Sequence, residues 1–164
     1  MQEQESLLLK DICNIKREVN LETLEAVIIL AVELAREGRE GRKIGAMFVV
    51  SDADEVLKRS KPLILDPLGL HPPEKKNIAD PNLRETLKEL AQLDGAFVIT
   101  DSGVVLSACR YINASSEGIE LPMGLGSRHM AAASITKETR AVAVVVSEAS
   151  VVRVFDNGEI VSEI

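Results

Sequence analysis

The chain is poor in aromatic residues and cysteines, and it has no long apolar run. Only 2% of its 164 residues are aromatic and tryptophan is absent, so the core has to be aliphatic. Two cysteines, Cys13 and Cys109, are too few for a disulfide-stapled scaffold and suit a reducing compartment. The longest apolar run, residues 26–32, falls well short of a bilayer span. We therefore expect a cytoplasmic protein that does not contact a membrane.

Acidic residues outnumber basic residues in this chain. Nineteen Lys and Arg stand against 26 Asp and Glu, which gives a net charge of −7. Binding to a nucleic-acid polymer depends on a basic surface that neutralises phosphates, so this balance works against that class of function. It still allows a small anionic ligand held by a few local cations. A hydrophobic content of 46% over 164 residues is enough for the core of one domain.

The first forty residues predict helical structure. Apolar residues recur with a helical period from residue 7 to residue 34, which indicates two helices or one helix with a joint. Asn20 is a suitable N-cap for the second helix, and Gly38 is a suitable end. We divide the chain into an N-terminal helical segment, residues 1–37, and a main domain, residues 38–164.

The remainder predicts alternating strands, loops and helices. Prolines between residues 62 and 81 favour irregular structure, and Asp80 with Pro81 predicts a helix that continues to about Gln92. A further helix is expected to begin at Ser127. The predicted strands are 44–50, 97–100, 104–106 and onward, 141–146, 151–155 and a short one after residue 158. This order indicates an α/β fold with a central mixed β-sheet flanked by helices.

Asp94, Gly95 and Ala96 form the first candidate site, between a predicted helix and a predicted strand. A carboxylate at this position is suited to holding a metal or accepting a proton, and glycine allows close approach to a ligand. The alternative is an Asp-Gly turn that only connects two elements.

The second candidate is a glycine-containing loop, residues 124–126, that leads into Ser127, Arg128 and His129. Free backbone N–H groups, a hydroxyl and a guanidinium at one helix start favour phosphate binding. The segment lacks the Gly-Lys-Ser/Thr ending of a P-loop. The alternative is a glycine-rich turn that carries an incidental arginine and a surface histidine.

Ser147 and Glu148 form a weaker candidate at the end of the predicted strand 141–146. Side chains at strand ends often face ligands in open sheets, although a plain turn is the alternative. The cysteine and histidine spacings characteristic of a protein-built zinc site are missing from the sequence.

Together, and in this order, these segments resemble the diadenylate cyclase domain family. Residues 41–50 are also similar to the early Gly-Lys-Ile-Gly-Ala-Leu-Phe-Val strand of that family. The resemblance extends from about residue 32 to residue 164, and its overall pattern is closest to archaeal members. It therefore identifies residues 38–164 as the catalytic domain.

The resemblance implies a specific reaction. Members of the family condense two ATP molecules into cyclic di-AMP, a second messenger, and release two pyrophosphates with the help of a divalent metal, Mn²⁺ or Mg²⁺. Each protomer holds one ATP, and two protomers of a homo-oligomer meet face to face. Each ribose 3′-hydroxyl then attacks the α-phosphorus of the other ATP.

The resemblance also implies roles for individual residues. Asp94 would activate the 3′-hydroxyl and hold the metal, while Arg128 and His129, with Ser127, would bind the triphosphate. Tyr111 and Ile112 lie where the family contacts adenine, and Gly95 lies against the ribose and phosphates. The other expected substrate-binding residues are Ala96, Gly126, Ser147 and Glu148.

Two positions depart from the family pattern. Met130 stands where the family has a second arginine, and Ala149 stands where it has a second glutamate. A neighbouring cation from Arg42, Lys43 or Arg110 is the expected replacement. A catalytically weak module that binds ATP or cyclic di-AMP is the alternative, and an assembly protein that uses residues 1–37 as its interface is a second alternative.

Overall fold

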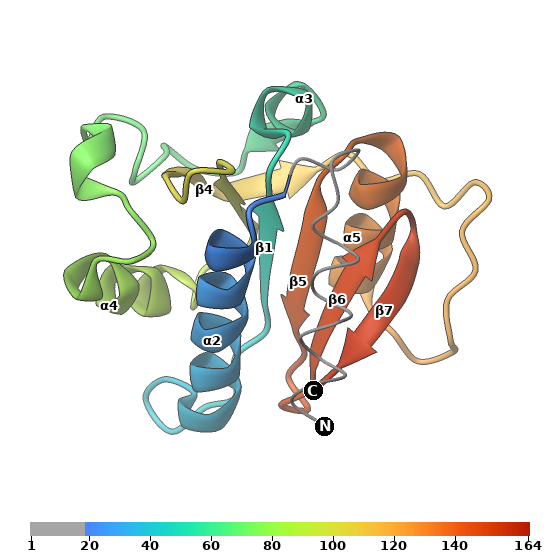
Figure 1. Ribbon diagram of the computed structural model, residues 1–164. Helices are drawn as coiled ribbons and strands as arrows, with labels where there is room; N and C mark the ends of the chain where they lie inside the picture. The colour runs from blue at the N-terminus through green and yellow to red at the C-terminus, as the bar shows by residue number, and fades with distance from the viewer. Residues whose placement is uncertain (1–18) are drawn as a thin grey trace.

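The computed structural model describes residues 19–164, which form one seven-stranded sheet with helices on its faces (Figure 1). The strand order is β2-β4-β3-β1-β5-β6-β7. Strands β1 and β3 are parallel, and the other neighbouring pairs are antiparallel. The strands are β1 Ala46–Val50, β2 Ser60–Pro62, β3 Ala96–Ile99, β4 Val105–Ile112, β5 Val142–Val146, β6 Val152–Asp156 and β7 Glu159–Glu163. The predicted mixed sheet is confirmed.

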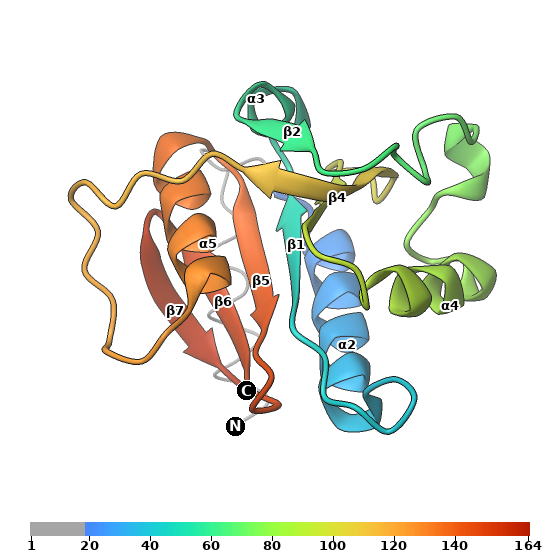
Figure 2. The ribbon, with the colours of Figure 1, turned by 180° about the vertical axis from the view of Figure 1, so that it is seen from behind.

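Helices cover both faces of the sheet. The helices are α2 Leu21–Glu37, α3 Ala53–Lys58, α4 Pro81–Leu90 and α5 Ser127–Glu138, with a 3₁₀ turn, η1, at Pro73–Lys75. Helix α2 lies over one face and α5 over the other, as the view from behind shows (Figure 2). Strand β1 is buried throughout because Phe48 and Val50 belong to the core cluster under α2, whereas Met47 and Val49 belong to the cluster under α5.

Helix α2 begins and ends where its sequence predicts. The Asn20 side chain accepts a hydrogen bond from Thr23 N at 3.2 Å, and Gly38 follows the last turn with a φ of +59°. The earlier helix expected within residues 1–19 lies outside the described residues, except for its last position. The aliphatic side of α2, including Leu24, Val27 and Leu30, is fully buried in this chain's own core. Within α2, therefore, most of the apolar face packs in this chain's own core, while Ile29 remains 53% exposed.

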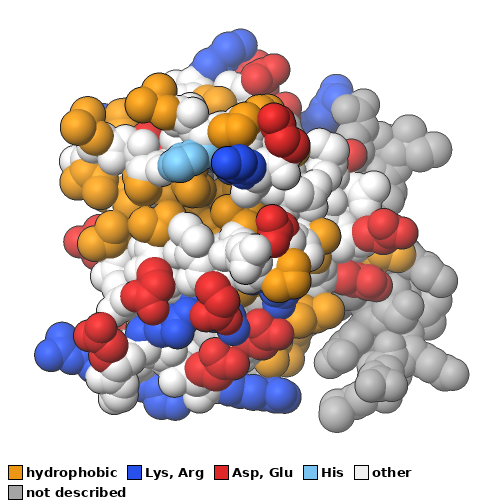
Figure 3. All heavy atoms as spheres, turned by 90° about the vertical axis from the view of Figure 1, so that its left-hand side faces the viewer, with side chains coloured by type: hydrophobic (Ala, Val, Ile, Leu, Met, Phe, Trp, Pro, Cys, Tyr) orange, Lys and Arg blue, Asp and Glu red, His pale blue; other side chains and the backbone are white. Residues whose placement is uncertain are grey.

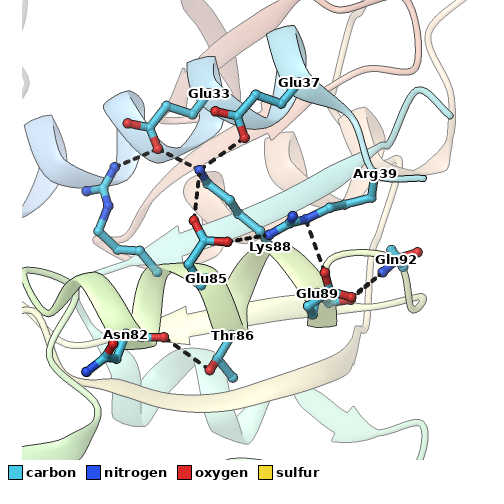
Figure 4. Close-up of polar contacts among 10 residues, drawn as sticks. Glu33, Glu37, Arg39, Asn82, Glu85, Thr86, Lys88, Glu89 and Gln92 are labelled. Atoms are coloured by element: carbon cyan, nitrogen blue, oxygen red, sulfur yellow. Dashed lines mark hydrogen bonds and ion pairs between the residues drawn. The ribbon is translucent and has the colours of Figure 1, made fainter. Parts of the chain in front are cut away.

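Ion pairs between buried and half-buried side chains connect helix α4 to α2 (Figure 4). Lys88 Nζ lies 3.0 Å from Glu33 Oε2 and 3.2 Å from Glu37 Oε2, and its side chain is only 7% exposed. Burial alone would lower the pKa of Lys88, but the two carboxylates outweigh burial and raise it. The helix begins at Pro81 as predicted and ends at Leu90, two residues earlier than expected. This attachment fixes the start of the segment that leads to Asp94.

The structure adds three short elements that the sequence did not predict, α3, β2 and the 3₁₀ turn η1. Each has at most six residues, too few for a hydrophobic period to be read. The region between residues 62 and 81 is irregular, as its prolines predict. Among residues 19–164, none of the helices has the length and apolar character required to cross a membrane.

Candidate active site

A pocket of about 560 Å³ lies between β4 and the start of α5, and we call it the β4 pocket. Six of the residues predicted from the sequence line it: Asp94, Gly95, Tyr111, Ile112, Ser127 and Arg128. Apolar groups from Met47, Leu63 and Ala131 form part of its wall. The Tyr111 side chain is half exposed, and Lys61 Nζ lies over its ring, 5.4 Å from the centroid, so a planar group would stack on the other ring face.

A second pocket, of about 430 Å³, lies between the start of α5 and β6, and we call it the β6 pocket. Its predicted lining residues are Gly126, Ser127, Arg128, His129, Ser147 and Glu148. Ser127 and Arg128 line both pockets, so the two cavities adjoin at the first turn of α5. The fold therefore brings together segments that are more than 50 residues apart in the sequence.

Ala96 is the exception among the predicted residues. Its side chain is fully buried in the core cluster under α5, and it lines neither pocket. It is the first residue of β3 and pairs with Met47 and Arg110 on the neighbouring strands. Its methyl group thus contributes to the core, and the structure does not place its side chain with the other candidate residues.

Glycine is required at position 95 by the backbone conformation there and by the close approach of strand β4. Its φ is +107°, a conformation that side chains disfavour, and a Cβ there would lie 2.5 Å from the carbonyl carbon of Cys109. Strand β4 approaches closely at this point because Cys109 has a φ of +58° and the β3–β4 register shifts. The close approach predicted for Gly95 is therefore made first to β4, at the edge of the β4 pocket.

Arg128 lies at the junction of the pockets and faces Asp94. Its Nη2 is 4.0 Å from Asp94 Oδ1, at the outer limit of an ion pair. The Asp94 side chain is 93% exposed and the Arg128 side chain 34%, so both groups remain accessible to a ligand. A weak, exposed pair of this kind is easily exchanged for contacts to substrate.

The first turn of α5 offers backbone donors to the same place. Gly126 is its N-cap and has no side chain to accept a hydrogen bond from the first-turn N–H groups. The turn contains no acidic residue, and Arg128 adds a positive charge. Such a helix start attracts anions through its free N–H groups and its dipole.

His129 is buried beneath this turn and touches Arg153. Its ring is 6% exposed, and its Nε2 lies 3.2 Å from Nη1 of Arg153. Burial lowers the pKa of His129, and the charges of Arg153 and Arg128 lower it further. The imidazole is therefore neutral at pH 7, and Nε2 accepts a hydrogen bond from Arg153. In this arrangement His129 supports an arginine and does not itself supply a positive charge.

Of the three cations expected to replace the arginine at position 130, Arg110 lines the β4 pocket. Its Nε donates to Ser60 Oγ at 2.8 Å and its Nη2 donates to Ser60 O at 3.1 Å, so β2 orients its guanidinium at the edge of that pocket. Arg42 and Lys43 line neither pocket. Met130 itself lines the β4 pocket, away from the β6 pocket.

Apolar side chains gather beside the β4 pocket. Leu63 lines it, and Ile64, Leu65 and Leu70 in the following loop are half to fully exposed. The face formed by this loop and α4 is apolar in its upper part and mixed in charge below (Figure 3). An exposed apolar patch of this kind is typical of a contact surface.

The residues present fit a divalent metal that is bound chiefly by substrate. Within residues 19–164, no three His, Cys, Asp or Glu side chains gather to hold an ion. Magnesium commonly takes one or two carboxylates and completes its coordination with substrate phosphates and water. The exposed carboxylate of Asp94, beside the pocket and close to Arg128, meets that requirement.

Sequence reasoning missed Arg153 and the role of Gly45. Arg153 lines the β6 pocket from the second position of β6, and a charged residue between two valines was the signal that could have indicated it. Gly45 lies so close to Arg128 that a side chain there would meet the guanidinium. No local signal marks that contact, because the two residues are 83 positions apart.

Comparison with known proteins agrees with the family suggested by the sequence. Residues 33–160 match the family described as "DisA bacterial checkpoint controller nucleotide-binding" (DAC). The chain belongs to the DAC family. It is 49% identical over 142 residues to a protein named diadenylate cyclase from Methanocaldococcus jannaschii, with 86% of this chain and 45% of that protein covered.

A second archaeal relative named diadenylate cyclase, from Haloferax volcanii, is 45% identical over 141 residues, with 84% of this chain and 51% of that protein covered. The chain thus spans about half the length of these curated DAC relatives.

Solved structures show the same fold at lower sequence identity. A structure titled as a hypothetical membrane spanning protein from Bacillus cereus has a TM-score of 0.63 and 21% identity, with 85% of this chain and 62% of that chain covered. A double mutant of DacA from Staphylococcus aureus has a TM-score of 0.55 and 20% identity, with 85% and 84% covered. The DAC fold is therefore common to this chain and these proteins.

Proposed function

We propose that this chain is a diadenylate cyclase that condenses two ATP molecules into cyclic di-AMP and releases two pyrophosphates. One observation carries the proposal: Ser127 and Arg128 line two adjoining pockets of different character. The β4 pocket has apolar walls and the Tyr111 ring, which suit adenine. The β6 pocket has a helix start and cations, which suit a triphosphate.

In this arrangement the α-phosphate lies at the junction, beside Arg128 and within reach of the Asp94 carboxylate. The new bond joins the ribose O3′ of one ATP to the α-phosphorus of the other, and the bond to the β-phosphate oxygen breaks. The 3′-hydroxyl proton passes to the Asp94 carboxylate, and pyrophosphate leaves through the β6 pocket. Ser127, Arg128 and the α5 N–H groups neutralise the phosphate oxygens and hold the reacting atoms in line.

A divalent metal, Mn²⁺ or Mg²⁺, bound by Asp94 and substrate phosphates, would supply further charge neutralisation at the reacting phosphate. The exposure of Asp94 supports this role, because within residues 19–164 its carboxylate has only the weak ion pair with Arg128 at 4.0 Å. A carboxylate beside phosphates would weaken nucleotide binding in a module that only binds. Asp94 therefore favours the enzyme over a nucleotide-binding module without turnover.

We further propose that two protomers of a homo-oligomer meet face to face during the reaction. One chain offers one triphosphate site, whereas the product needs two nucleotides related by a two-fold axis. The apolar loop at Leu63, Leu65 and Leu70 beside the β4 pocket is a suitable part of that contact. We keep residues 38–164 as the catalytic domain, with α2 of the N-terminal segment completing its core.

The deciding experiment incubates the pure protein with ATP and Mn²⁺ and looks for cyclic di-AMP by mass spectrometry. We expect cyclic di-AMP and pyrophosphate in a ratio of one to two, and no cyclic product from GTP at a comparable rate. An Asp94→Asn protein, folded by circular dichroism, is the matched control and should form no product. ATP binding without any product from the unaltered protein would favour the binding module instead.

A further inference from the structure

Arg153 lies in the β6 pocket without a role in the function proposed so far. It is the second residue of β6, and its neighbours Val152 and Val154 are buried. Its side chain is only 15% exposed, yet it lines the pocket together with Ser127, Arg128 and Glu148. A largely covered arginine directed to a cavity is costly unless its charge is used or paired.

Two neighbours hold the guanidinium in a fixed orientation. Nε donates to Glu163 Oε1 at 2.9 Å, and Nη1 donates to His129 Nε2 at 3.2 Å. Nη2 makes no such contact with the rest of the described chain. Glu163 is 56% exposed at the sheet edge, so water weakens its hold on the charge. His129 is neutral and accepts a hydrogen bond without cancelling the charge.

We propose that Arg153 is the second cation of the phosphate site. It binds the β- or γ-phosphate of ATP, while Arg128 binds the α-phosphate. This inference rests on the proposed function and adds the residue that recognises the outer phosphates. It also gives His129 a defined task as a positioning residue: its ring orients Arg153 toward the pocket. Arginine is suited to this task because its planar fork of donors matches phosphate oxygens.

Arg128 and Arg153 occupy different positions and would therefore contact different phosphates of ATP. Arg128 lies at the junction, 4.0 Å from Asp94, and lines both pockets. Arg153 lines only the β6 pocket, on the side away from Tyr111 and Asp94. An ATP whose adenine occupies the β4 pocket would therefore reach Arg153 only with the distal part of its triphosphate. Removal of Arg153 should affect ligands in proportion to how many phosphates they carry.

The test measures dissociation constants of AMP, ADP and ATP for the unaltered protein, Arg153→Gln and Arg153→Lys by calorimetry with Mg²⁺ present. We expect Arg153→Gln to weaken ATP binding by about tenfold or more and AMP binding by less than about threefold. Arg153→Lys should lose less affinity for ATP because it keeps the charge. Arg36→Gln, which removes the same charge from the exposed end of α2, is the matched control and should bind all three nucleotides normally.

Glu163→Gln tests a purely structural role. If Arg153 only joined β6 to β7, Glu163→Gln would reproduce the loss seen in Arg153→Gln, and the inference would be overturned. Equal weakening of AMP and ATP in Arg153→Gln, or no weakening of either, would also overturn it while leaving the proposed function intact. If the unaltered protein bound no ATP, both the inference and the proposed function would fail.

Discussion

Arg128 lies directly over the α-carbon of Gly45. A Cβ at Gly45 would be 2.6 Å from Nη1 of Arg128 and 2.9 Å from its Cζ, closer than such atoms approach one another. The hydrogen atom of glycine is therefore what leaves room for the guanidinium between the two pockets. Gly45 precedes β1 and Arg128 lies in the first turn of α5, so the contact joins two elements that are distant in the sequence.

From this contact we predict that Gly45→Ala displaces Arg128 without unfolding the protein. The conflicting atoms belong to the end of a flexible side chain, so the guanidinium moves and the backbone stays. Losing its charge-assisted contact should lower kcat/KM for ATP by about tenfold or more, with little change in melting temperature. Gly69→Ala is the control, since a methyl group there meets only ordinary contacts with Asp66. Normal activity in Gly45→Ala would show that the position of Arg128 does not matter.

Asp94→Asn and Arg128→Ala should have different effects. Asp94→Asn removes the activating charge at nearly constant shape, so turnover should fall by about 10²-fold or more while ATP still binds. Arg128→Ala should weaken ATP binding as well, because it deletes a phosphate contact at the junction of both pockets. Binding by calorimetry and product by mass spectrometry separate the two effects. A fully active Asp94→Asn enzyme would disprove the mechanism.

Cyclic di-AMP formation should require a divalent metal. The described residues offer Asp94 beside the pocket but no cluster of three metal-binding side chains, so the ion should be held weakly without nucleotide. Excess EDTA should abolish product formation, and Mn²⁺ or Mg²⁺ should restore it. The folded state should be unaffected by EDTA, which circular dichroism checks. Product at the full rate in EDTA would remove the metal from the mechanism.

Specific activity should depend on protein concentration. If two protomers must meet, activity per milligram should rise with concentration at low protein and then level off. The net charge of −7 opposes close approach, so the facing pair should be weak without nucleotide and metal. Leu65→Glu, in the exposed apolar loop, should shift the rise to higher concentration. Constant specific activity where mass photometry detects only monomers would rule out the two-protomer reaction.

The ion pairs between α2 and α4 should make stability depend on pH. Burial alone would raise the pKa of Glu33, but hydrogen bonds from Lys88 and Arg84 outweigh it and lower the pKa below 4.5. The stabilisation from Glu33 is therefore fully present above pH 4.5 and is lost as pH falls through the lowered value. The pKa of Lys88 is raised above 10.5, so its contribution holds below pH 10.5 and is lost as pH rises through the raised value.

Lys88→Met tests this linkage. It keeps the buried stem of the side chain and removes the ammonium, so it should lower the free energy of unfolding by about 1 kcal/mol at pH 7. The difference from the unaltered protein should shrink below pH 4.5, where Glu33 becomes protonated. Urea unfolding of both proteins at several pH values measures this difference in the free energy of unfolding. A difference that stays constant from pH 7 to pH 3 would contradict the assigned ion pairs.

Much of the local structure was determined by the sequence itself. Asn20 and Gly38 set the two ends of α2 because a side-chain acceptor and a residue tolerant of positive φ are needed at those points. Asp80 and Pro81 set the start of α4 for a similar reason. The segments around Asp94 and Arg128 were identifiable from their residue types and order. All of these signals are local, since each depends on a few neighbouring residues.

Only the tertiary structure decided which of these segments meet. The strand order places β1 between β3 and β5, and this brings Asp94, Gly45 and Arg128 together. Hydrophobic periodicity indicates which side of an element is buried, but it does not specify the neighbour that buries it. For the same reason the sequence did not predict that Ala96 turns into the core, or that Arg153 faces the pocket from a strand of valines. Contacts between residues that are distant in the sequence depend on the packing of the whole sheet, and the functional site of this protein is made of such contacts.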